Sequence, residues 1–443
     1  MREIGVRTAG ELLGALADGA RRIIVRNEIS RLACLRLPPG VHLEGGSLVF
    51  GARGIVLSTD NELSGIVIDC PEHEVAIGND TGVEDLGSLV LRDVRTTGQV
   101  LVLVEGAVRN GAVVVDGLTV AAADLRGRLD RPHGFGVDAM QGALTIWNRQ
   151  PDPDVVIEAT VDRVSVGSPE RPIRGSGVFV GGLGDDEGRS AGGHLEVTVL
   201  GTGAVHVDGG IRPGTTDLIS GAVFVQTGAV VDEVRTAGPV MTAGANDMAL
   251  DNWGEVRRWI CTAPVTTAGP SGIGVVNFGY LRQLDVRAPI ETFGTGARGF
   301  NLYGGSLESA AFDSICTHGD GAVGVQVSVP MPTLVVRGDV VTTGGEGTSL
   351  VQGQPVTLKA VALSVKPGGR IDEVIVGGHL RTTGSGVVSM ELLGPVGSLR
   401  TAKGIVAQGT ASDAVHVAPG LAGVLAGVEL QADHGSTVVE VRG

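Results

Sequence analysis

Residues 221–344 repeat with a period of about 25 residues, a length typical of supersecondary units that stack and bury a continuous core. Threonine recurs at one position of the repeat, and glycine recurs two residues further on. The threonines are Thr242, Thr267, Thr292, Thr317 and Thr342, and the glycines are Gly244, Gly269, Gly294, Gly319 and Gly344. Few folds accept so regular a spacing. We therefore expect a solenoid, which grows by adding repeats rather than domains.

An apolar and an aromatic column, each made of residues at one repeat position, run through the same segment. The apolar column is Val225, Leu250, Val275, Phe300 and Val325, and the aromatic column is Trp253, Phe278 and Tyr303. Short valine-rich runs alternate with glycine-containing corners, a pattern typical of short β-strands joined by turns. The sequence thus predicts an all-β, single-domain coil of strands.

The composition excludes several other classes of protein. Glycine accounts for 72 of the 443 residues but follows no Gly-X-Y period, and apolar runs are dense, so neither collagen nor a disordered chain fits. The formal net charge is −15 and the arginines are scattered, so nucleic acid is not an expected partner. No apolar run approaches the ~18 residues that a membrane-spanning helix needs, so no membrane partner is expected.

The cysteines give no sign of a disulfide or metal framework. They form no CxxC motif, and we interpret them as small buried apolar residues: Cys34, Cys70, Cys261 and Cys316. No cofactor or metal site is predicted, and the acidic run at 185–187 is interpreted as solvated. The N-terminus carries no apolar secretory signal. We predict a cytoplasmic protein, or a secreted one if a leader is removed.

A short helix is predicted before the first strand. Thr8 and Glu11 have the spacing of a capping box, in which the threonine hydroxyl accepts an N–H and the glutamate reaches back. The apolar face of this helix is predicted to be Leu12, Leu13, Leu16 and Ala17. We assign residues 1–20 to a capping helix that shields open strand edges, and residues 21–443 to the coil of strands.

The residues after this helix carry a resemblance to a known superfamily. GARRIIVRNEI at 19–29 and LRLPPGVHLEGG at 35–46 precede short strands with Gly or Asn at the corners. The arrangement resembles the right-handed parallel β-helix of the pectin-lyase-like proteins over nearly the whole chain. That superfamily includes polysaccharide lyases, glycoside hydrolases, epimerases, fructan transferases, phage tailspikes and adhesins. The resemblance implies a right-handed parallel β-helix and a carbohydrate partner, but it transfers no catalytic residue.

Four segments interrupt the even spacing and are predicted to be insertions: 149–154, 181–193, 212–217 and 345–357. Insertions in repeat folds often lie on the binding face. We therefore expect a groove along the first strand of each repeat. Strand alternation predicts an outward polar column on that strand, beside a column of smaller residues. The expected outward column is Trp147, Gly181, Gln226, Asp251, Val276, Asn301, Gln326, Lys366, Glu391 and His416.

Asp251 is the leading candidate for a catalytic carboxylate in this groove. Asp247 on the same strand lies roughly 13 Å away in an extended chain, too far for a glycosidase pair, so the partner must come from elsewhere. His133 and Asp138 are the further catalytic candidates. The candidate substrate-binding residues are Gln226, Asn301, Gln326, Trp253, Tyr303, Trp147 and Arg149. The alternatives are that the polar column is simply solvated, that the aromatic column is a structural stack, and that His133 and Asp138 are turn residues.

These observations predict a carbohydrate-active enzyme that cleaves or rearranges glycosidic bonds of an oligosaccharide or polysaccharide. A hydrolase or transferase is favoured over a lyase, because lyases of anionic polysaccharides usually need a basic cleft and this chain is acidic. The alternative is a non-catalytic glycan-binding or structural β-helix protein. A homo-oligomer that packs through the sides or ends of the solenoid is also predicted, since those surfaces are flat.

Overall fold

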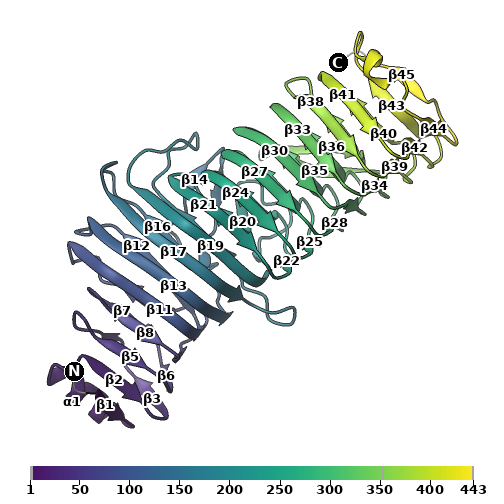
Figure 1. Ribbon diagram of the computed structural model, residues 1–443. Helices are drawn as coiled ribbons and strands as arrows, with labels where there is room; N and C mark the ends of the chain where they lie inside the picture. Colours follow the sequence, from purple (N-terminus) through teal and green to yellow (C-terminus); the bar gives the residue numbers. More distant parts are fainter. Residues whose placement is uncertain (1–2, 352–353, 442–443) are drawn as a thin grey trace. The chain divides into compact units, whose positions relative to one another are not determined.

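The computed structural model describes residues 3–351 and 354–441, and nearly all regular structure in these residues is β-strand (Figure 1). The chain divides into two compact units. The first comprises Met1–Gly209 and Val223–Val234, and the second comprises Gly210–Ala222 and Arg235–Gly443. Strands β20 (Leu218–Val225) and β21 (Ala229–Thr236) span the boundaries between them. The expectation of an all-β chain is confirmed.

Each repeat of the second unit contributes three strands, which form three rows. The first row contains β23 (Asp247–Asn252), β26 (Ile273–Asn277), β29 (Arg298–Leu302), β32 (Val323–Val327), β37 (Leu363–Val365), β40 (Val388–Leu392), β43 (Asp413–Val417) and β45 (Val438–Glu440). The second row contains β24 (Glu255–Cys261), β27 (Tyr280–Val286), β30 (Ser306–Phe312), β33 (Pro330–Val336), β38 (Arg370–Val376) and β41 (Val396–Thr401). The third row contains β22 (Val240–Thr242), β25 (Val265–Thr267), β28 (Ile290–Thr292), β31 (Ile315–Thr317), β34 (Val340–Thr342), β39 (Leu380–Thr382), β42 (Ile405–Ala407) and β44 (Leu430–Ala432).

Strands of successive repeats pair in parallel, in the register that the sequence period predicts. Thr242 pairs with Thr267 and Asn252 with Asn277, so each residue meets its counterpart one repeat further on. The chain therefore returns to pair with itself after each repeat, an arrangement consistent with a parallel β-helix. The threonine column is buried, and the asparagine column forms a ladder in which the Asn252 amide donates to Asn277 Oδ1 at 2.7 Å. The asparagine contact links neighbouring repeats in register, whereas the hydroxyls of Thr242, Thr267 and Thr292 have no hydrogen-bond partner among the described residues.

The first unit uses the same parallel pairing with repeats of less regular length. Its first row contains β4 (Leu35–Arg36), β7 (Ile55–Leu57), β10 (Val75–Asn79), β12 (Gln99–Val104), β16 (Gly142–Asn148) and β18 (Ser176–Gly181). Two further rows begin as β1 (Glu3–Val6), β2 (Arg22–Val25), β5 (His42–Glu44) and β8 (Glu62–Ser64), and as β3 (Glu28–Leu32), β6 (Ser47–Phe50) and β9 (Val67–Asp69). Both rows join on the long strand β11 (Asp85–Thr97), which pairs with β8 and β9. The long strands β13 (Asn110–Ala122), β17 (Val156–Val166) and β19 (His194–Val207) follow.

Two register expectations are wrong. A 25-residue period aligns Val100 with Val75, but the structure pairs Val100 with Ile77, because the register shifts at an irregularity between Val75 and Ile77. Ser364 rather than Lys366 follows Gln326 in the first row, because the intervening insertion shifts the chain by two residues. Elsewhere the expected columns pair as predicted, and Trp147 lies opposite Gly181.

The helix α1 (Ala9–Ala17) forms where it was expected, with a different buried face. The Thr8 hydroxyl accepts the Glu11 N–H at 3.2 Å, and the Glu11 carboxylate accepts the Arg7 N–H at 2.7 Å. Leu12 and Leu16 are buried, whereas Leu13 is 54% exposed. Ala17 is exposed as well, and Ala15 takes its place in the buried face. The helix is short and packs against β1, β2 and β3, so only a narrow stripe of it is covered.

The predicted insertions occupy connections between strands. Residues 149–154 connect β16 to β17, 182–193 connect β18 to β19, and 212–217 precede β20. Segment 345–357 contains most of an antiparallel hairpin of β35 (Glu346–Val351) and β36 (Gln354–Lys359), and its residues 352–353 lie outside the described residues. A further hairpin, β14 (His133–Gly134) with β15 (Val137–Ala139), lies between β13 and β16.

The four cysteines differ in burial. All four cysteines are free thiols. Cys70 and Cys261 are buried as expected, Cys316 is partly buried, and Cys34 is exposed, so the expectation of burial is wrong for Cys34. Among the described residues no helix has the length and apolar character needed to cross a membrane.

The glycine column has a steric cause. A Cβ added to Gly294 would lie 1.8 Å from the carbonyl oxygen of Gly269, one repeat earlier. Gly269, Gly319, Gly344, Gly384 and Gly409 would each meet the preceding glycine's carbonyl oxygen at 1.7 to 2.0 Å. Because these contacts are with backbone atoms, no side-chain movement can relieve them.

Replacing Gly294 by alanine should therefore destabilise the chain by about 2–3 kcal/mol, the usual cost of overpacking a close-packed site. The measurement is the midpoint of urea unfolding followed by circular dichroism. Gly423→Ala is the matched control, since an added Cβ there meets no atom within 4 Å. Equal midpoints for the two variants would contradict the steric explanation.

Candidate functional site

Most of the predicted outward column does not face solvent, although Lys366, Glu391 and His416 at its far end are partly exposed. Asp251 and Asn301 are 0% exposed and Gln326 is 5% exposed in the second unit. Trp147 and Gln226 are 4% and 1% exposed in the first unit. The expectation of an open groove along this row is wrong, because every residue of β26, β29 and β32 is buried and both faces of these strands are covered. The hairpin β35–β36 supplies part of the cover.

Contacts of this hairpin show how it covers the row. The Ser349 hydroxyl donates to the carbonyl oxygen of Gly296 at 2.7 Å, and the Leu350 N–H donates to the Ser271 hydroxyl at 3.1 Å. Leu358 packs against the cluster of Val323, Val361 and Val388. An insertion that was expected to flank an open groove therefore lies over part of it.

Asp251 is a buried carboxyl group with no surface on which a glycan could lie. Neither of its oxygens accepts a hydrogen bond of ordinary geometry from the described residues. Burial raises the pKa of Asp251 well above its usual value, and a contact with the indole of Trp253 lowers it only in part. A raised pKa is typical of a general acid, but general-acid catalysis also requires access to the substrate.

The rings of the aromatic column pack on one another, with Trp253 buried and Phe278 and Tyr303 partly exposed. Trp253, at 3% exposure, meets Phe278 edge-on with ring centroids 6.2 Å apart, and Phe278 stacks on Tyr303 at 5.1 Å. The buried Arg298 guanidinium lies 5.9 Å from the Tyr303 ring, and burial lowers the pKa of this arginine. Burial of Trp253 favours a structural role over a platform for sugar rings.

The structure brings His133 and Asp138 together. They lie opposite each other on the hairpin β14–β15, with His133 Nδ1 2.8 Å from Asp138 Oδ1, and their side chains are 43% and 45% exposed. Arg149 lies over the Trp147 ring at 4.7 Å and forms ion pairs with Glu105 and Asp130 at 3.1 and 3.3 Å. Arg149 is therefore neutralised, and the Trp147 N–H is used by the carbonyl oxygen of Gly182 at 3.0 Å.

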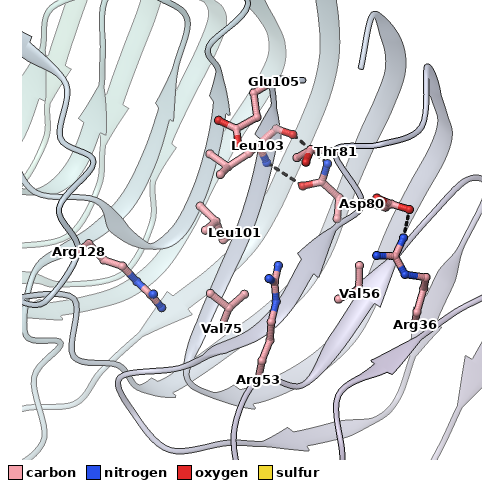
Figure 2. Close-up of a pocket in the computed structure, with 11 residues that line it drawn as sticks. Arg36, Arg53, Val56, Val75, Asp80, Thr81, Leu101, Leu103, Glu105 and Arg128 are labelled. Carbon is pink, nitrogen blue, oxygen red and sulfur yellow. Dashed lines mark hydrogen bonds and ion pairs between the residues drawn. The ribbon is translucent and has the colours of Figure 1, made fainter. Parts of the chain in front are cut away.

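A pocket of about 340 Å³ lies over the first row of the first unit (Figure 2). Its floor follows one column of paired strands. Arg36 on β4 pairs with Val56 on β7, which pairs with Gly78 on β10, which pairs with Leu101 on β12. The complete lining is Arg36, Arg53, Val56, Val75, Asn79, Asp80, Thr81, Leu101, Leu103, Glu105 and Arg128. These residues join an apolar floor to a polar rim.

Gly78 makes room for a cation over this floor. A Cβ at Gly78 would lie 3.0 Å from Arg53 Nη2 and 3.2 Å from a methyl group of Val75. The Arg53 guanidinium thus lies close above bare backbone, and Figure 2 shows it on one side of Val75 with the Arg128 guanidinium on the other. Neither arginine forms an ion pair with a described residue. Burial lowers the pKa of Arg128 and Arg53 lowers it further, while the charge of Glu74 opposes the shift in part.

The acidic groups of the pocket are already paired. Asp80 forms an ion pair with Arg36, and Glu105 forms one with Arg149 at 3.1 Å. Arg128 donates one hydrogen bond, to the carbonyl oxygen of His73 at 3.2 Å, and its buried Nε has no partner among the described residues. Two cationic groups are therefore left to face the cavity. A carboxylate or another small anion between them would satisfy both.

Sequence reasoning missed this pocket because its residues come from repeats of unequal length. Arg36, Arg53 and Arg128 occupy no common column, and Arg53 and Arg128 lie between strands rather than on them. The available signal was Gly78, a glycine inside a strand, which often marks the close approach of another group.

Comparisons of the chain with known protein families, with curated proteins and with solved structures find no match. Function is therefore argued from the geometry.

Asp251→Asn should stabilise the folded chain at neutral pH. Because the pKa of Asp251 is raised in the folded chain, the folded state loses stability as pH rises from the unfolded pKa, about 4, towards the folded value. Asparagine keeps the shape and removes the charge. The gain in the free energy of unfolding should be absent below about pH 4 and reach on the order of 1 kcal/mol or more at pH 7.

Urea unfolding at a series of pH values measures this gain, with Asp313→Asn, a partly exposed aspartate of the same unit, as the control. A gain that does not change with pH, or a loss of stability at pH 7, would show that Asp251 is not a buried, uncompensated carboxyl group.

Proposed function

We propose that the protein is a parallel β-helix protein that binds a carboxylate-bearing glycan, such as one containing uronic acid, in the pocket of the first unit. The observation that carries the proposal is the pair of guanidinium groups, Arg53 and Arg128, that face the cavity without an ion-pair partner among the described residues. The finer architecture, a right-handed β-helix of the pectin-lyase-like kind with α1 as its N-terminal cap, belongs to the same proposal. The parallel ladders and the packing of α1 on β1, β2 and β3 support it.

Local charge points to an anion. The chain has a formal net charge of −15, so most of its surface favours cations. Two cations without an ion-pair partner in one pocket give this pocket the opposite local charge. Holding two guanidinium groups near each other in a partly buried site costs free energy, and burial and Arg53 both lower the pKa of Arg128. An anionic ligand offsets this cost, and a guanidinium group binds a planar carboxylate through two parallel N–H···O hydrogen bonds.

The floor and the size of the pocket favour a sugar. Val56, Val75, Leu101 and Leu103 provide an apolar surface on which the C–H face of a pyranose ring can lie. Thr81 and the two arginines offer hydrogen bonds to hydroxyl groups. A volume of about 340 Å³ is near the lower end for small-ligand pockets, and suits a short oligosaccharide segment.

Binding is better supported than hydrolysis. A glycosidase of either kind needs one carboxyl group that donates a proton and a second that acts as base or nucleophile. Asp80 and Glu105 are each held in an ion pair with an arginine, so neither is free to take one of these roles. The carbohydrate-active enzyme expected from the sequence remains the second candidate. Its specific support is that the pocket is locally basic, which favours a lyase of an acidic polysaccharide rather than the hydrolase or transferase that the sequence favours.

Arg53→Gln should weaken binding of a short oligogalacturonate by about tenfold to a hundredfold, because a hydrogen bond between charged groups contributes about 1.5–3 kcal/mol. Isothermal titration calorimetry measures the dissociation constant. The matched control is Arg95→Gln, which alters an exposed arginine of β11 in the same unit. The affinity of the control variant should equal that of the unmodified chain, and rising salt should weaken all three.

The same samples distinguish a binding protein from an enzyme. Unsaturated products detected by ultraviolet absorbance would indicate a lyase, and new reducing ends without unsaturation a hydrolase. Equal affinity for a neutral oligosaccharide, or equal losses in the Arg53 and Arg95 variants, would contradict recognition of a carboxylate in this pocket.

A further inference from the structure

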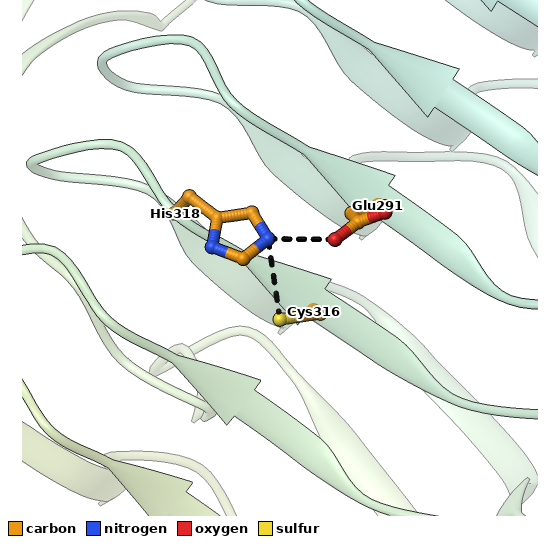
Figure 3. Close-up of side chains that lie close together, drawn as sticks. All are labelled: Glu291, Cys316 and His318. Atoms are coloured by element: carbon orange, nitrogen blue, oxygen red, sulfur yellow. Dashed lines mark hydrogen bonds and ion pairs between the residues drawn. The ribbon is translucent and has the colours of Figure 1, made fainter.

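Three side chains of different chemical type converge on the short third row of the second unit (Figure 3). Glu291 lies on β28 and pairs in register with Cys316 on β31, and His318 follows the end of β31. His318 Nε2 lies 2.8 Å from Glu291 Oε1 and 3.5 Å from Cys316 Sγ. The three candidate ligand atoms all lie within 4.8 Å of one another.

This group interrupts the repeat at one place. The residues of the Glu291 and Cys316 column are Met241, Thr266, Glu291, Cys316, Val341, Arg381 and Val406. The residues at the position of His318 are Ala243, Ala268, Phe293, His318, Thr343, Thr383, Gln408 and Asp433. In these columns a thiol and an imidazole occur only at Cys316 and His318, and the adjacent repeat places the carboxylate of Glu291 beside them. The lack of a CxxC motif predicted that Cys316 is a small apolar residue, and no single column reveals its contact with His318.

The geometry differs from that of a nucleophilic catalytic triad. In a triad the base uses one ring nitrogen for the nucleophile and the other for the acid. Here the carboxylate and the thiol both approach Nε2, a single atom that carries either one proton or one lone pair. A proton on Nε2 can serve the carboxylate only, which leaves the sulfur without a strong partner. A cation at the point of convergence would serve all three atoms.

Neighbouring side chains hold the imidazole in place. The Phe293 ring stacks on His318 with centroids 4.7 Å apart and an angle of 12° between the planes. The Thr343 hydroxyl lies 3.5 Å from Nδ1, the other ring nitrogen. Metal-binding histidines commonly use their second nitrogen for an outer hydrogen bond that fixes the tautomer and the ring orientation. Nε2 is thereby left directed at Glu291 and Cys316.

We propose that Glu291, Cys316 and His318 bind a zinc ion through one oxygen, one sulfur and one nitrogen, with a fourth position open to solvent. Thiolate and imidazole ligands favour zinc over magnesium or calcium, which prefer oxygen ligands. Tetrahedral zinc places a sulfur and a nitrogen ligand about 3.5 Å apart, the separation found between Cys316 and His318. The carboxylate must withdraw by about 0.5 Å to reach the corresponding oxygen–nitrogen distance of about 3.3 Å.

The charge balance and exposure of the site agree with this assignment. A carboxylate and a thiolate together neutralise a divalent ion. The side chains of Glu291 and His318 are 46% and 33% exposed, so an ion can enter without unfolding the chain. Zinc sites with three protein ligands leave a position for water or substrate, whereas structural sites usually have four. The site lies in the second unit and its test is independent of the glycan pocket.

Cobalt(II) titration of the full chain, first stripped of metal with a chelator, tests the proposal. We expect one cobalt ion per chain, a near-ultraviolet band from thiolate-to-cobalt charge transfer, and visible bands of tetrahedral coordination. Added zinc should displace the cobalt. Cys316→Ser should abolish the charge-transfer band, Glu291→Gln and His318→Ala should each weaken binding at least tenfold, and a variant with all three substitutions should bind no cobalt.

Cys34→Ser is the matched control, since Cys34 is the exposed thiol of the chain and lies in the other unit. The control variant should keep the full spectrum. Circular dichroism verifies that each variant is folded, and Glu291→Gln preserves the shape of the site. The proposal fails if the charge-transfer band persists in Cys316→Ser. It also fails if no cobalt binds, or if the triple variant binds as much cobalt as the unmodified chain.

Discussion

Contact between the backbones of successive glycines is the constraint on which the second unit depends. The carbonyl oxygen of one glycine occupies the space that a Cβ of the next would need, so the repeats approach closely at this corner. Parallel strands lie about 4.8 Å apart, and only glycine tolerates that spacing when the chain also turns. Every strand row then keeps its register, and the threonine and asparagine columns form ladders as a consequence. The close approach of the repeats at the glycine corner thus aligns the residues of the polar columns and of the aromatic stack.

The sequence predicted the architecture well where the repeat is strict, and less well elsewhere. A strict period determines which residues pair, so Asp251, Val276, Asn301 and Gln326 lie in one row as expected. The period does not determine which face is covered. Alternation along a strand identifies two faces, but burial of Asp251 depends on segments far away in sequence, and periodicity contains no information about them. The sequence did not predict the pocket for a related reason, since Arg53 and Arg128 lie between strands of repeats of unequal length.

Buried polar groups have two different outcomes in this chain. The Asn252 amide donates to Asn277, and the Asn277 amide donates to the backbone, so most of the polar atoms of this pair are hydrogen-bonded and its burial contributes to specificity. Asp251 and Arg298 are buried without such networks, and burial moves the pKa of each towards the neutral form. The groups with partly open surroundings are different. Arg53 and Arg128 face a cavity, so an anion from solvent can reach their guanidinium groups. Glu291, Cys316 and His318 converge near the surface, so a metal ion from solvent can reach their ligand atoms. The pocket and the Glu291–Cys316–His318 group are therefore better suited to ligand binding than the buried column that contains Asp251.

The hairpin β35–β36 shows how such a chain can acquire new surface. Thr342 pairs with Thr382 across a longer stretch of chain than separates Thr317 from Thr342, yet the ladder on either side continues without a bulge. The extra residues leave the ladder and return to it at neighbouring positions, so the entropy of closing the loop is the main cost of the excursion. Evolution can therefore lengthen or exchange this segment while selection on the ladder stays unchanged. Among proteins descended from such a chain, differences in length and sequence should be most frequent in segments of this kind. The spacing of the glycines should be the same in all of them.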